Sequence, residues 1–196
     1  MQFSIICGLL ITCFYALYFY KQIQLRRQGI KTNRLAKGSK PAKTATVERW
    51  LLVATYGTAV IQYLSVFIQK HMLPFTLPLW VRWIGLVIAA CGVIIFLLAI
   101  TTMRDNWRAG VDESQSTEMV TRGVYRFSRN PAFVGFDLLY IGTVLALPNI
   151  PMLLAAIVAI VVLHLQIVEE EAYLPSVFGE SYLAYKKRTP RYFLFF

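Results

Sequence analysis

The side chains best suited to chemistry lie in two charged clusters that are far apart in the sequence. The first cluster ends with Arg129, Asn130 and Pro131, and the second is the acidic triplet at 169–171. A guanidinium group can hold a carboxylate through two parallel hydrogen bonds, and a carboxylate accepts hydrogen bonds from cationic or hydroxyl groups. The clusters therefore contain groups that would bind a charged ligand, or bind each other.

Each cluster borders a hydrophobic run, and the two runs are joined by a turn-forming sequence at 148–151 that begins and ends with proline. At 1.5 Å per helical residue, the runs 132–147 and 152–168 correspond to helices of about 24 and 26 Å. So short a connection predicts a tight antiparallel hairpin. The two clusters would then meet at its open end, at the edge of a bilayer.

The helix dipole makes both clusters unusual. Arg129 would precede the N-terminus of one helix and the acidic triplet would end another, whereas the dipole favours the opposite charges at both places. This placement indicates a nearby partner for each cluster. Simpler explanations stay open, because Asn130 and Pro131 suit the first residues of a helix, arginines set membrane topology, and carboxylates at a helix end are often solvated.

The composition indicates an integral membrane protein. Of the 196 residues, 57% are hydrophobic and 15% are charged, whereas soluble domains have about 25% charged residues. The runs 3–20, 50–69 and 80–103 add to the two hairpin runs, giving five segments that approach or reach the length needed to cross hydrocarbon. We predict an all-α integral membrane protein with five transmembrane helices, the last two forming the hairpin.

The chain has no room for a second soluble domain, so we predict a single membrane domain over 1–196. Residues 1–103 would form three spans with a basic loop, and residues 104–196 would contain both charged clusters. Apolar side chains after the last span recur at the spacing of one helix face: Leu174, Phe178, Tyr182 and Tyr185. They predict an amphipathic interfacial helix that covers the site.

Lysine and arginine are concentrated at 21–49, 104–129 and 186–191, and few occur in the other loops. The positive-inside rule then places the N-terminus outside, and the C-terminus and both clusters on the cytoplasmic side. All three basic segments share one side if the number of spans is odd. Membrane topology and contacts with anionic lipid explain the net charge of +10, and no nucleic-acid-binding motif is found.

Two pairs of residues inside the hydrophobic runs predict contacts between helices. Asp137 and His164 each lie about 9 Å from the charged end of their run, so we hypothesise that they touch; separate partners for each are the alternative. Gly85 and Gly92 are seven residues apart, on one face of a helix, where glycine allows another helix to approach closely.

Several classes of site are not indicated. The cysteines Cys7, Cys13 and Cys91 all lie in apolar runs and form no ligand pattern, so no metal site is predicted. No glycine-rich motif follows a strand pattern, so a Rossmann nucleotide site is not predicted either. The chemistry is expected at the two charged clusters.

At these clusters the sequence resembles the isoprenylcysteine carboxyl methyltransferase family, within the wider group that includes membrane phospholipid methyltransferases. Family members carry Gly-x-Tyr-x-x-x-Arg-His-Pro-x-Tyr-x-Gly before a hydrophobic hairpin, and Glu-Glu-x-x-Leu, Phe-Gly and Tyr-x-x-Tyr after it. Here the first element runs from Gly123 to Gly135, and the second from Glu170 to Tyr185. The resemblance covers about 117–190, and the first three spans add only hydrophobicity.

The resemblance implies S-adenosylmethionine as methyl donor, with S-adenosylhomocysteine as product, and a lipidic or prenylated acceptor that enters from the bilayer. It also implies that residues 104–196 form the catalytic region with the cofactor site. The implied catalytic residues are Arg129, Glu170 and Glu171, and Gln166 would contact the acceptor. Arg129 would either orient an acceptor carboxylate or pair with one of the glutamates. The implied cofactor-binding residues are Thr117, Glu118, Met119, Val120, Tyr125, Asn130, Pro131, Ala132, Phe133 and Glu170.

Three positions depart from the family pattern. Asn130 stands in place of histidine, Phe133 in place of tyrosine, and Gln166 where members with a prenylcysteine substrate have arginine. The expected activity is methylation of the carboxylate of a C-terminal isoprenylcysteine. The alternatives are methylation of a phospholipid amine, an NADPH-dependent activity like that of sterol reductases, and a non-catalytic membrane scaffold.

Overall fold

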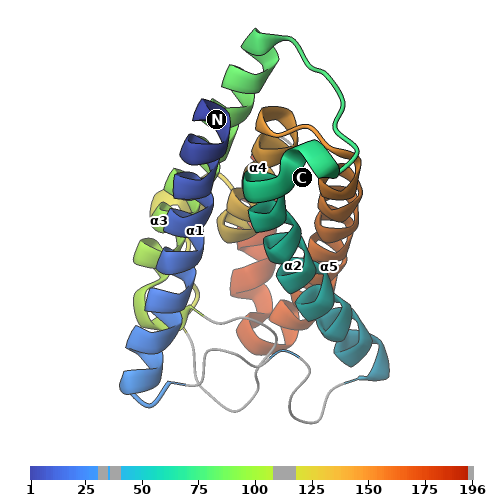
Figure 1. The fold of residues 1–196 in the computed structure, drawn as a ribbon. Coiled ribbons are helices and arrows are strands. Elements are labelled where there is room, and N and C mark those ends of the chain that lie inside the picture. The colour runs from blue at the N-terminus through green and yellow to red at the C-terminus, as the bar shows by residue number, and fades with distance from the viewer. Residues whose placement is uncertain (31–34, 36–40, 108–117, 194–196) are drawn as a thin grey trace.

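The computed structural model describes residues 1–30, 35, 41–107 and 118–193. These residues form helices and connecting segments without a sheet, and one isolated bridge joins Pro74 and Asn149. The α-helices are α1 (Gln2–Arg27), α2 (Ala42–Ile68), α3 (Leu79–Met103), α4 (Pro131–Ala146) and α5 (Ile150–Arg188), as Figure 1 shows. The short 3₁₀ helices are η1 (Gln69–His71), η2 (Arg104–Asn106) and η3 (Gly123–Arg126).

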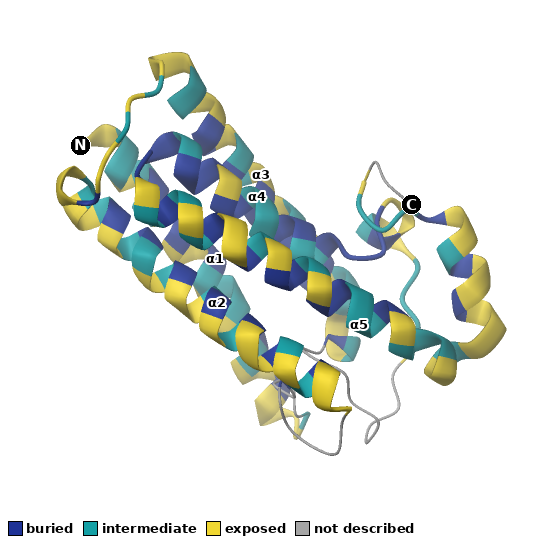
Figure 2. Ribbon diagram, turned by 90° about the vertical axis from the view of Figure 1, so that its right-hand side faces the viewer, coloured by how far each residue is buried: buried dark blue, intermediate teal, exposed yellow. Residues whose placement is uncertain are grey.

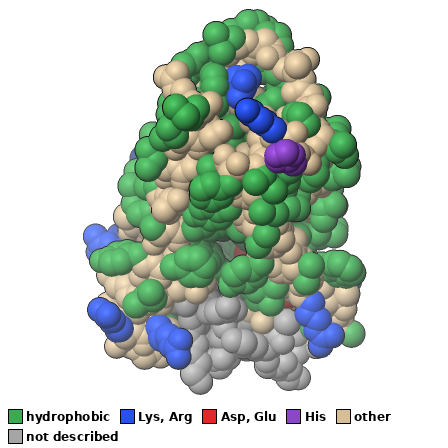
Figure 3. Space-filling view, in the orientation of Figure 1, with side chains coloured by type: hydrophobic (Ala, Val, Ile, Leu, Met, Phe, Trp, Pro, Cys, Tyr) green, Lys and Arg blue, Asp and Glu red, His purple; other side chains and the backbone are tan. Residues whose placement is uncertain are grey.

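The helices have the lengths and composition of a membrane protein. Four of them, α1, α2, α3 and α5, are long and apolar enough to cross a bilayer, whereas the apolar helix α4 has 16 residues. Hydrophobic side chains cover most of the face shown in Figure 3, and most of the Lys and Arg side chains visible there lie toward its lower end. The predicted all-helical membrane fold is confirmed for the described ranges, and the count of five spans stays a prediction.

Glycines bring α3 and α4 into backbone contact. A Cβ atom added to Gly92 would lie 2.7 Å from the carbonyl oxygen of Gly135, and one added to Gly142 would lie 2.5 Å from the carbonyl oxygen of Gly85. The close contact predicted from Gly85 and Gly92 is therefore confirmed. The contacting residues on α4 are a second pair of glycines, Gly135 and Gly142, which have the same spacing of seven residues. The sequence analysis did not single out this second pair.

Replacing Gly142 by alanine is expected to destabilise the protein by about 1–3 kcal/mol, the usual cost of forcing a methyl group into a packed interface. The measurement is the midpoint of thermal unfolding in detergent. Gly57→Ala on α2 is the matched control, because a Cβ atom there meets nothing within 4 Å, and it should be neutral or slightly stabilising. Equal midpoints for the two variants would contradict the backbone contact.

The connection between α4 and α5 is short and firmly held. Asn149 caps α5 by accepting a hydrogen bond from the backbone N–H of Met152 (2.9 Å), and its amide donates to the Leu147 carbonyl (2.8 Å) and to Ser65 of α2 (3.0 Å). The helices that it joins find their main neighbours elsewhere, since α4 packs most extensively on α3 and α5 on α2. Although α4 and α5 are consecutive, each therefore packs mainly on a helix other than the one to which it is joined.

The last helix is longer than the sequence predicted. Residues 169–171 do not end α5, which continues through the acidic triplet as far as Arg188. The expectation of acids at a helix C-terminus is therefore wrong, because glutamate is a good helix former and the end of a hydrophobic run does not require the helix to end. A break occurs at Gly179 (φ 54°, ψ −136°), in a region of backbone conformation that is essentially restricted to glycine. Figure 2 shows the chain turning there, so that the last helical segment lies across the end of the bundle.

Candidate functional site

The two charged clusters meet through a buried ion pair. Arg129 Nη2 donates to both carboxylate oxygens of Glu171, at 3.0 and 3.2 Å, and Nε donates to one of them at 3.1 Å. Each side chain is only 3% exposed. Arg129 immediately precedes α4 and Glu171 lies in α5, so residues 42 positions apart close the charged end of the bundle, as the lengths of the two hydrophobic runs predicted.

Glu171 has further partners. Arg191 donates to its two oxygens at 3.2 and 3.0 Å, and the side-chain amide of Asn130 donates to one of them at 3.2 Å. The hydrogen bond to this carboxylate raises the pKa of Arg191 above its ordinary value. Asn130 does occupy the position that caps α4, but its side chain makes no capping hydrogen bond, because it is directed to Glu171 instead.

The C-terminal segment 186–192, here called the C-terminal strap, is bound to the start of α4. Arg129 Nη1 donates to the carbonyl of Lys186 at 3.1 Å and also to that of Thr189, and its backbone N–H donates to Pro190 at 2.9 Å. The hydroxyl of Ser128 donates to the Arg191 carbonyl at 3.0 Å. The three guanidinium nitrogens of Arg129, Nε, Nη1 and Nη2, therefore all donate hydrogen bonds within the protein.

Tyr125 is joined to the last part of α5 by a hydrogen bond. Its carbonyl accepts a 2.6 Å hydrogen bond from the hydroxyl of Tyr185, in the predicted C-terminal helix. Burial, followed by the neighbouring Tyr185 and the charge of Glu170, raises the pKa of Tyr125 well above its ordinary value. The phenol is therefore neutral at physiological pH.

The three consecutive glutamates have three different environments. Glu169 accepts hydrogen bonds from Lys43 (2.6 Å) and Thr44 (2.7 Å) at the start of α2. Glu171 binds the arginines. Glu170 lies between them and accepts a 2.9 Å hydrogen bond from the side-chain amide of Gln166, one turn earlier in α5. Of the three, only Glu170 lines the large cavity of the bundle.

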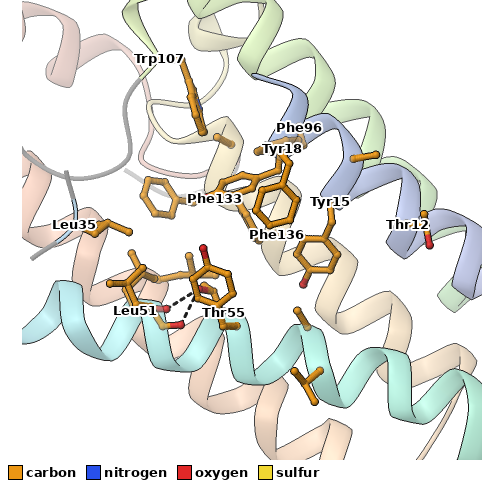
Figure 4. A pocket seen from close by; sticks show the side chains of 18 of the residues that line it. Thr12, Tyr15, Tyr18, Leu35, Leu51, Thr55, Phe96, Trp107, Phe133 and Phe136 are labelled. Carbon is orange, nitrogen blue, oxygen red and sulfur yellow. Dashed lines mark hydrogen bonds between the residues drawn. The ribbon is translucent and has the colours of Figure 1, made fainter. Parts of the chain in front are cut away.

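That cavity has a volume of about 560 Å³ and is walled mainly by apolar and aromatic side chains. It lies among α1, α2, α4 and α5, and Figure 4 shows Phe133 and Phe136 of α4 opposite Leu51 and Thr55 of α2, with Tyr15 of α1 beside Phe136. The surface between α1 and α2 is hollowed in Figure 3. Pockets of this size and apolar character are typical of small-molecule sites.

The structure brings most of the predicted site residues together, in two groups. Arg129, Asn130 and Glu171 form the ion-pair cluster, with Pro131 buried beside them at the start of α4. Ala132, Phe133 and Glu170 line the cavity, and Gln166 is fully buried next to Glu170. Their roles in catalysis and binding stay predictions.

The remaining predicted residues lie apart from these groups. Thr117 is outside the described residues. Glu118 is exposed and its backbone N–H donates to Asn106 at 3.0 Å, which ties this segment to η2, directly after α3, while Met119 and Val120 are half-buried. The hypothesised contact between Asp137 and His164 is not made. His164 instead forms a 2.7 Å hydrogen bond with Tyr192 of the strap, and one carboxylate oxygen of Asp137 is buried without a hydrogen-bond partner.

The sequence analysis missed two contributions to the site. Arg191 was counted only as a topology signal, although it binds Glu171. No site residue was predicted in the first two helices, yet α1 and α2 supply much of the cavity wall, including Tyr15 and Tyr63. The recurrence of tyrosines in these two helices was the available signal, but aromatic residues in membrane helices are also common where they face lipid headgroups.

Comparison with known proteins identifies a protein family whose model matches part of this chain. The family model described as phospholipid methyltransferase matches residues 80–181. A protein-S-isoprenylcysteine O-methyltransferase of Xenopus laevis is 35% identical over 114 residues, which are 57% of this chain and 40% of that protein. The corresponding protein of Schizosaccharomyces pombe is 41% identical over 73 residues, 37% of this chain and 31% of that protein.

A longer match is found in a plant protein. Protein-S-isoprenylcysteine O-methyltransferase B of Arabidopsis thaliana is 27% identical over 166 residues, which cover 74% of this chain and 84% of that protein. The match spans less than half the length of the Xenopus and Schizosaccharomyces relatives. Most of the two charged clusters lies inside the stretch that the family model matches.

Proposed function

Because this chain belongs to the phospholipid methyltransferase family, we propose that it is a membrane enzyme that transfers a methyl group from S-adenosylmethionine to a lipid-like acceptor. The acceptor proposed first is the carboxylate of a C-terminal isoprenylcysteine, as the names of the relatives indicate for those proteins. The observation that carries the proposal is the apolar cavity with the Glu170 carboxylate in its wall, beside the start of α4.

The residues at this end of the cavity fit a polar, positively charged cofactor. Glu170 supplies a carboxylate for the positive charge and Phe133 an aromatic face, while the N-terminus of α4 favours the negatively charged carboxylate of the same cofactor. The side-chain oxygen of Gln166 is buried and has no hydrogen-bond partner. A buried unpaired acceptor is costly, so a ligand that donates a hydrogen bond there would remove that cost.

When bound, S-adenosylmethionine supplies an electrophilic methyl group on a positively charged sulfur. In the transfer, the bond from that carbon to sulfur breaks as a bond to an acceptor oxygen forms. A carboxylate acceptor is already ionised at neutral pH, so the protein need not supply a base. The protein's part is to position the acceptor and exclude water, and such positioning can contribute roughly 7–11 kcal/mol. The apolar wall formed by Phe133, Phe136 and Leu163 serves both purposes.

The buried contacts of Arg129 favour a positioning role for this residue. Its guanidinium binds Glu171 and two strap carbonyls, so we propose that Arg129 and Glu171 fix the strap and the start of α4 while Glu170 binds the cofactor. Gln166 is proposed to contact the acceptor or the cofactor through its unpaired oxygen. The segment 117–120 is proposed to complete the cofactor site.

We further propose that all five α-helices span or enter the bilayer, with the N-terminus outside and the site on the cytoplasmic side. The basic ends of three helices support this topology. Lys and Arg residues lie in the last turns of α1 and α5 and near the start of α2, at the same end of the bundle as the Glu169–Lys43 ion pair. The positive-inside rule places that end in the cytoplasm.

The proposed function is tested with the purified full chain in lipid nanodiscs. Titration calorimetry with S-adenosylhomocysteine should show saturable binding. Labelled S-adenosylmethionine should then give methyl transfer to a farnesylcysteine analogue. Phosphatidylethanolamine is the second acceptor to test, because the description of the family model favours a phospholipid. Absence of binding would overturn the methyltransferase proposal, and transfer to phosphatidylethanolamine alone would replace the first acceptor by the second.

A further inference from the structure

The cavity has a charged end and, along α1 and α2, a far end. Glu170, Ala132 and Phe133 lie at the charged end of α4 and α5. On α2 the lining residues extend from Leu51 to Tyr63, a rise of about 18 Å along the helix. Figure 4 shows this direction, with Leu35 and Phe133 toward one side and Thr12 toward the other.

The far end is crossed by hydrogen bonds between side chains, from the exposed pair Thr12 and Tyr63 to the buried pair Gln62 and Thr143. The hydroxyls of Thr12 and Tyr63 are 3.2 Å apart, and the Tyr15 hydroxyl donates to the side-chain oxygen of Gln62 at 2.7 Å. The amide of Gln62 then donates to the Thr143 hydroxyl of α4 at 3.0 Å. These five residues, here called the polar belt, connect α1, α2 and α4.

The polar belt is formed from groups that are costly inside a bilayer unless they are paired. Gln62 and Thr143 are fully buried, and Thr143 also donates to the Leu139 carbonyl at 2.7 Å. The belt ties the helices together, but it also borders the cavity, because Thr12, Tyr15 and Tyr63 are among the lining residues. An apolar chain that pushed past these side chains would break hydrogen bonds without replacing them.

We propose that the polar belt sets the maximum length of the acceptor's lipid chain, with Tyr63 and Thr12 as the residues that close the cavity. A chain with its reacting group near Glu170 lies along the apolar wall, and its far end stops at the belt. This proposal deepens the proposed function and rests on it, since it concerns the chain of the same acceptor.

The test compares cysteine analogues carrying geranyl, farnesyl and geranylgeranyl chains. Tyr63→Ala should deepen the cavity and raise the ratio of kcat/KM for geranylgeranyl over farnesyl about tenfold, mainly through KM. Tyr56→Ala is the matched control, because Tyr56 lines the same cavity on the same helix, seven residues from the belt. It should weaken all three chains alike and leave the ratio unchanged.

A second variant changes the cavity in the opposite direction. Ala59 lines the cavity one turn before Tyr63, so Ala59→Phe should shorten it and reduce kcat/KM for geranylgeranyl more than for geranyl. This variant keeps the proposal falsifiable if Tyr63→Ala does not fold. Unchanged ratios in the folded variants would overturn the proposal.

Direct binding of the three analogues separates this proposal from the proposed function. Calorimetric affinities that follow chain length, and shift in the two variants as described, would support the polar belt even in the absence of methyl transfer. Methyl transfer with the same ratio of chain lengths in all variants would sustain the enzyme and overturn the role of the belt.

Discussion

Replacing Glu170 by alanine is expected to reduce methyl transfer about a hundredfold and to weaken binding of S-adenosylhomocysteine to a similar degree, while the protein stays folded. Glu170 is the carboxylate of the triplet that lines the cavity. Hydrogen bonds to charged groups contribute about 1.5–3 kcal/mol, and the upper end of that range corresponds to roughly a hundredfold in affinity or rate. The measurements are kcat/KM with a farnesylcysteine analogue and calorimetric titration of the cofactor product.

The adjacent Glu169 provides the matched control. Its partner Lys43 is 78% exposed, and exposed ion pairs contribute less than about 1 kcal/mol. Glu169→Ala should therefore change kcat/KM less than about fivefold. Glu170→Gln keeps the size of the side chain and removes its charge, so a loss close to that of Glu170→Ala would assign the effect to the charge. Equal losses in the variants of Glu169 and Glu170 would refute a specific role for Glu170.

Replacing Arg129 by methionine is expected to destabilise the protein by about 3–5 kcal/mol, the usual cost of removing one member of a buried ion pair. The loss should exceed the usual value for surface residues because Arg129 is 3% exposed and also binds the strap carbonyls. For a chain of this size the midpoint of thermal unfolding should fall by roughly 10 °C. Faster hydrogen exchange of the backbone amides at 186–191 would show that the loss of stability affects the C-terminal strap.

The double variant Arg129→Met/Glu171→Met distinguishes positioning from chemistry. Apolar replacement of both partners often restores stability, so the double variant should unfold at a higher temperature than Arg129→Met alone. If the pair only positions the strap, the double variant should also regain part of its methyl transfer. Recovered stability with no recovered activity would instead support the catalytic roles that the family resemblance implied for these two residues.

The general arrangement of the site follows from simple features of the sequence. Two hydrophobic runs of nearly equal length, joined by a short proline-flanked turn, require the clusters at 129–131 and 169–171 to lie at the same end of the bundle. The spacing of Gly85 and Gly92 likewise predicts a close helix contact, which the structure shows against Gly135 and Gly142. Both predictions depend only on helix length and periodicity, which local sequence determines.

The individual partners could not be predicted in the same way. Which glutamate faces the cavity depends on the rotation of α5 against α2 and α4, and the hydrophobic run 152–168 does not determine that rotation. The contact of Arg191 with Glu171 depends on the turn at Gly179, whose backbone conformation is not encoded by a periodic pattern. His164 pairs with Tyr192 for the same reason, because the strap returns to the bundle only after that turn.

Successive residues of an α-helix project about 100° apart around its axis. The three glutamates of α5 therefore point in three directions, toward α2, toward the cavity and toward the strap. A rotation of α5 that moved Glu170 out of the cavity would separate Glu169 from Lys43 and Glu171 from Arg129 at the same time. The buried Arg129–Glu171 pair is the stronger of these two constraints, because the Lys43–Glu169 pair is exposed and contributes little. The accuracy with which Glu170 is directed into the cavity therefore depends mainly on an ion pair outside the cavity.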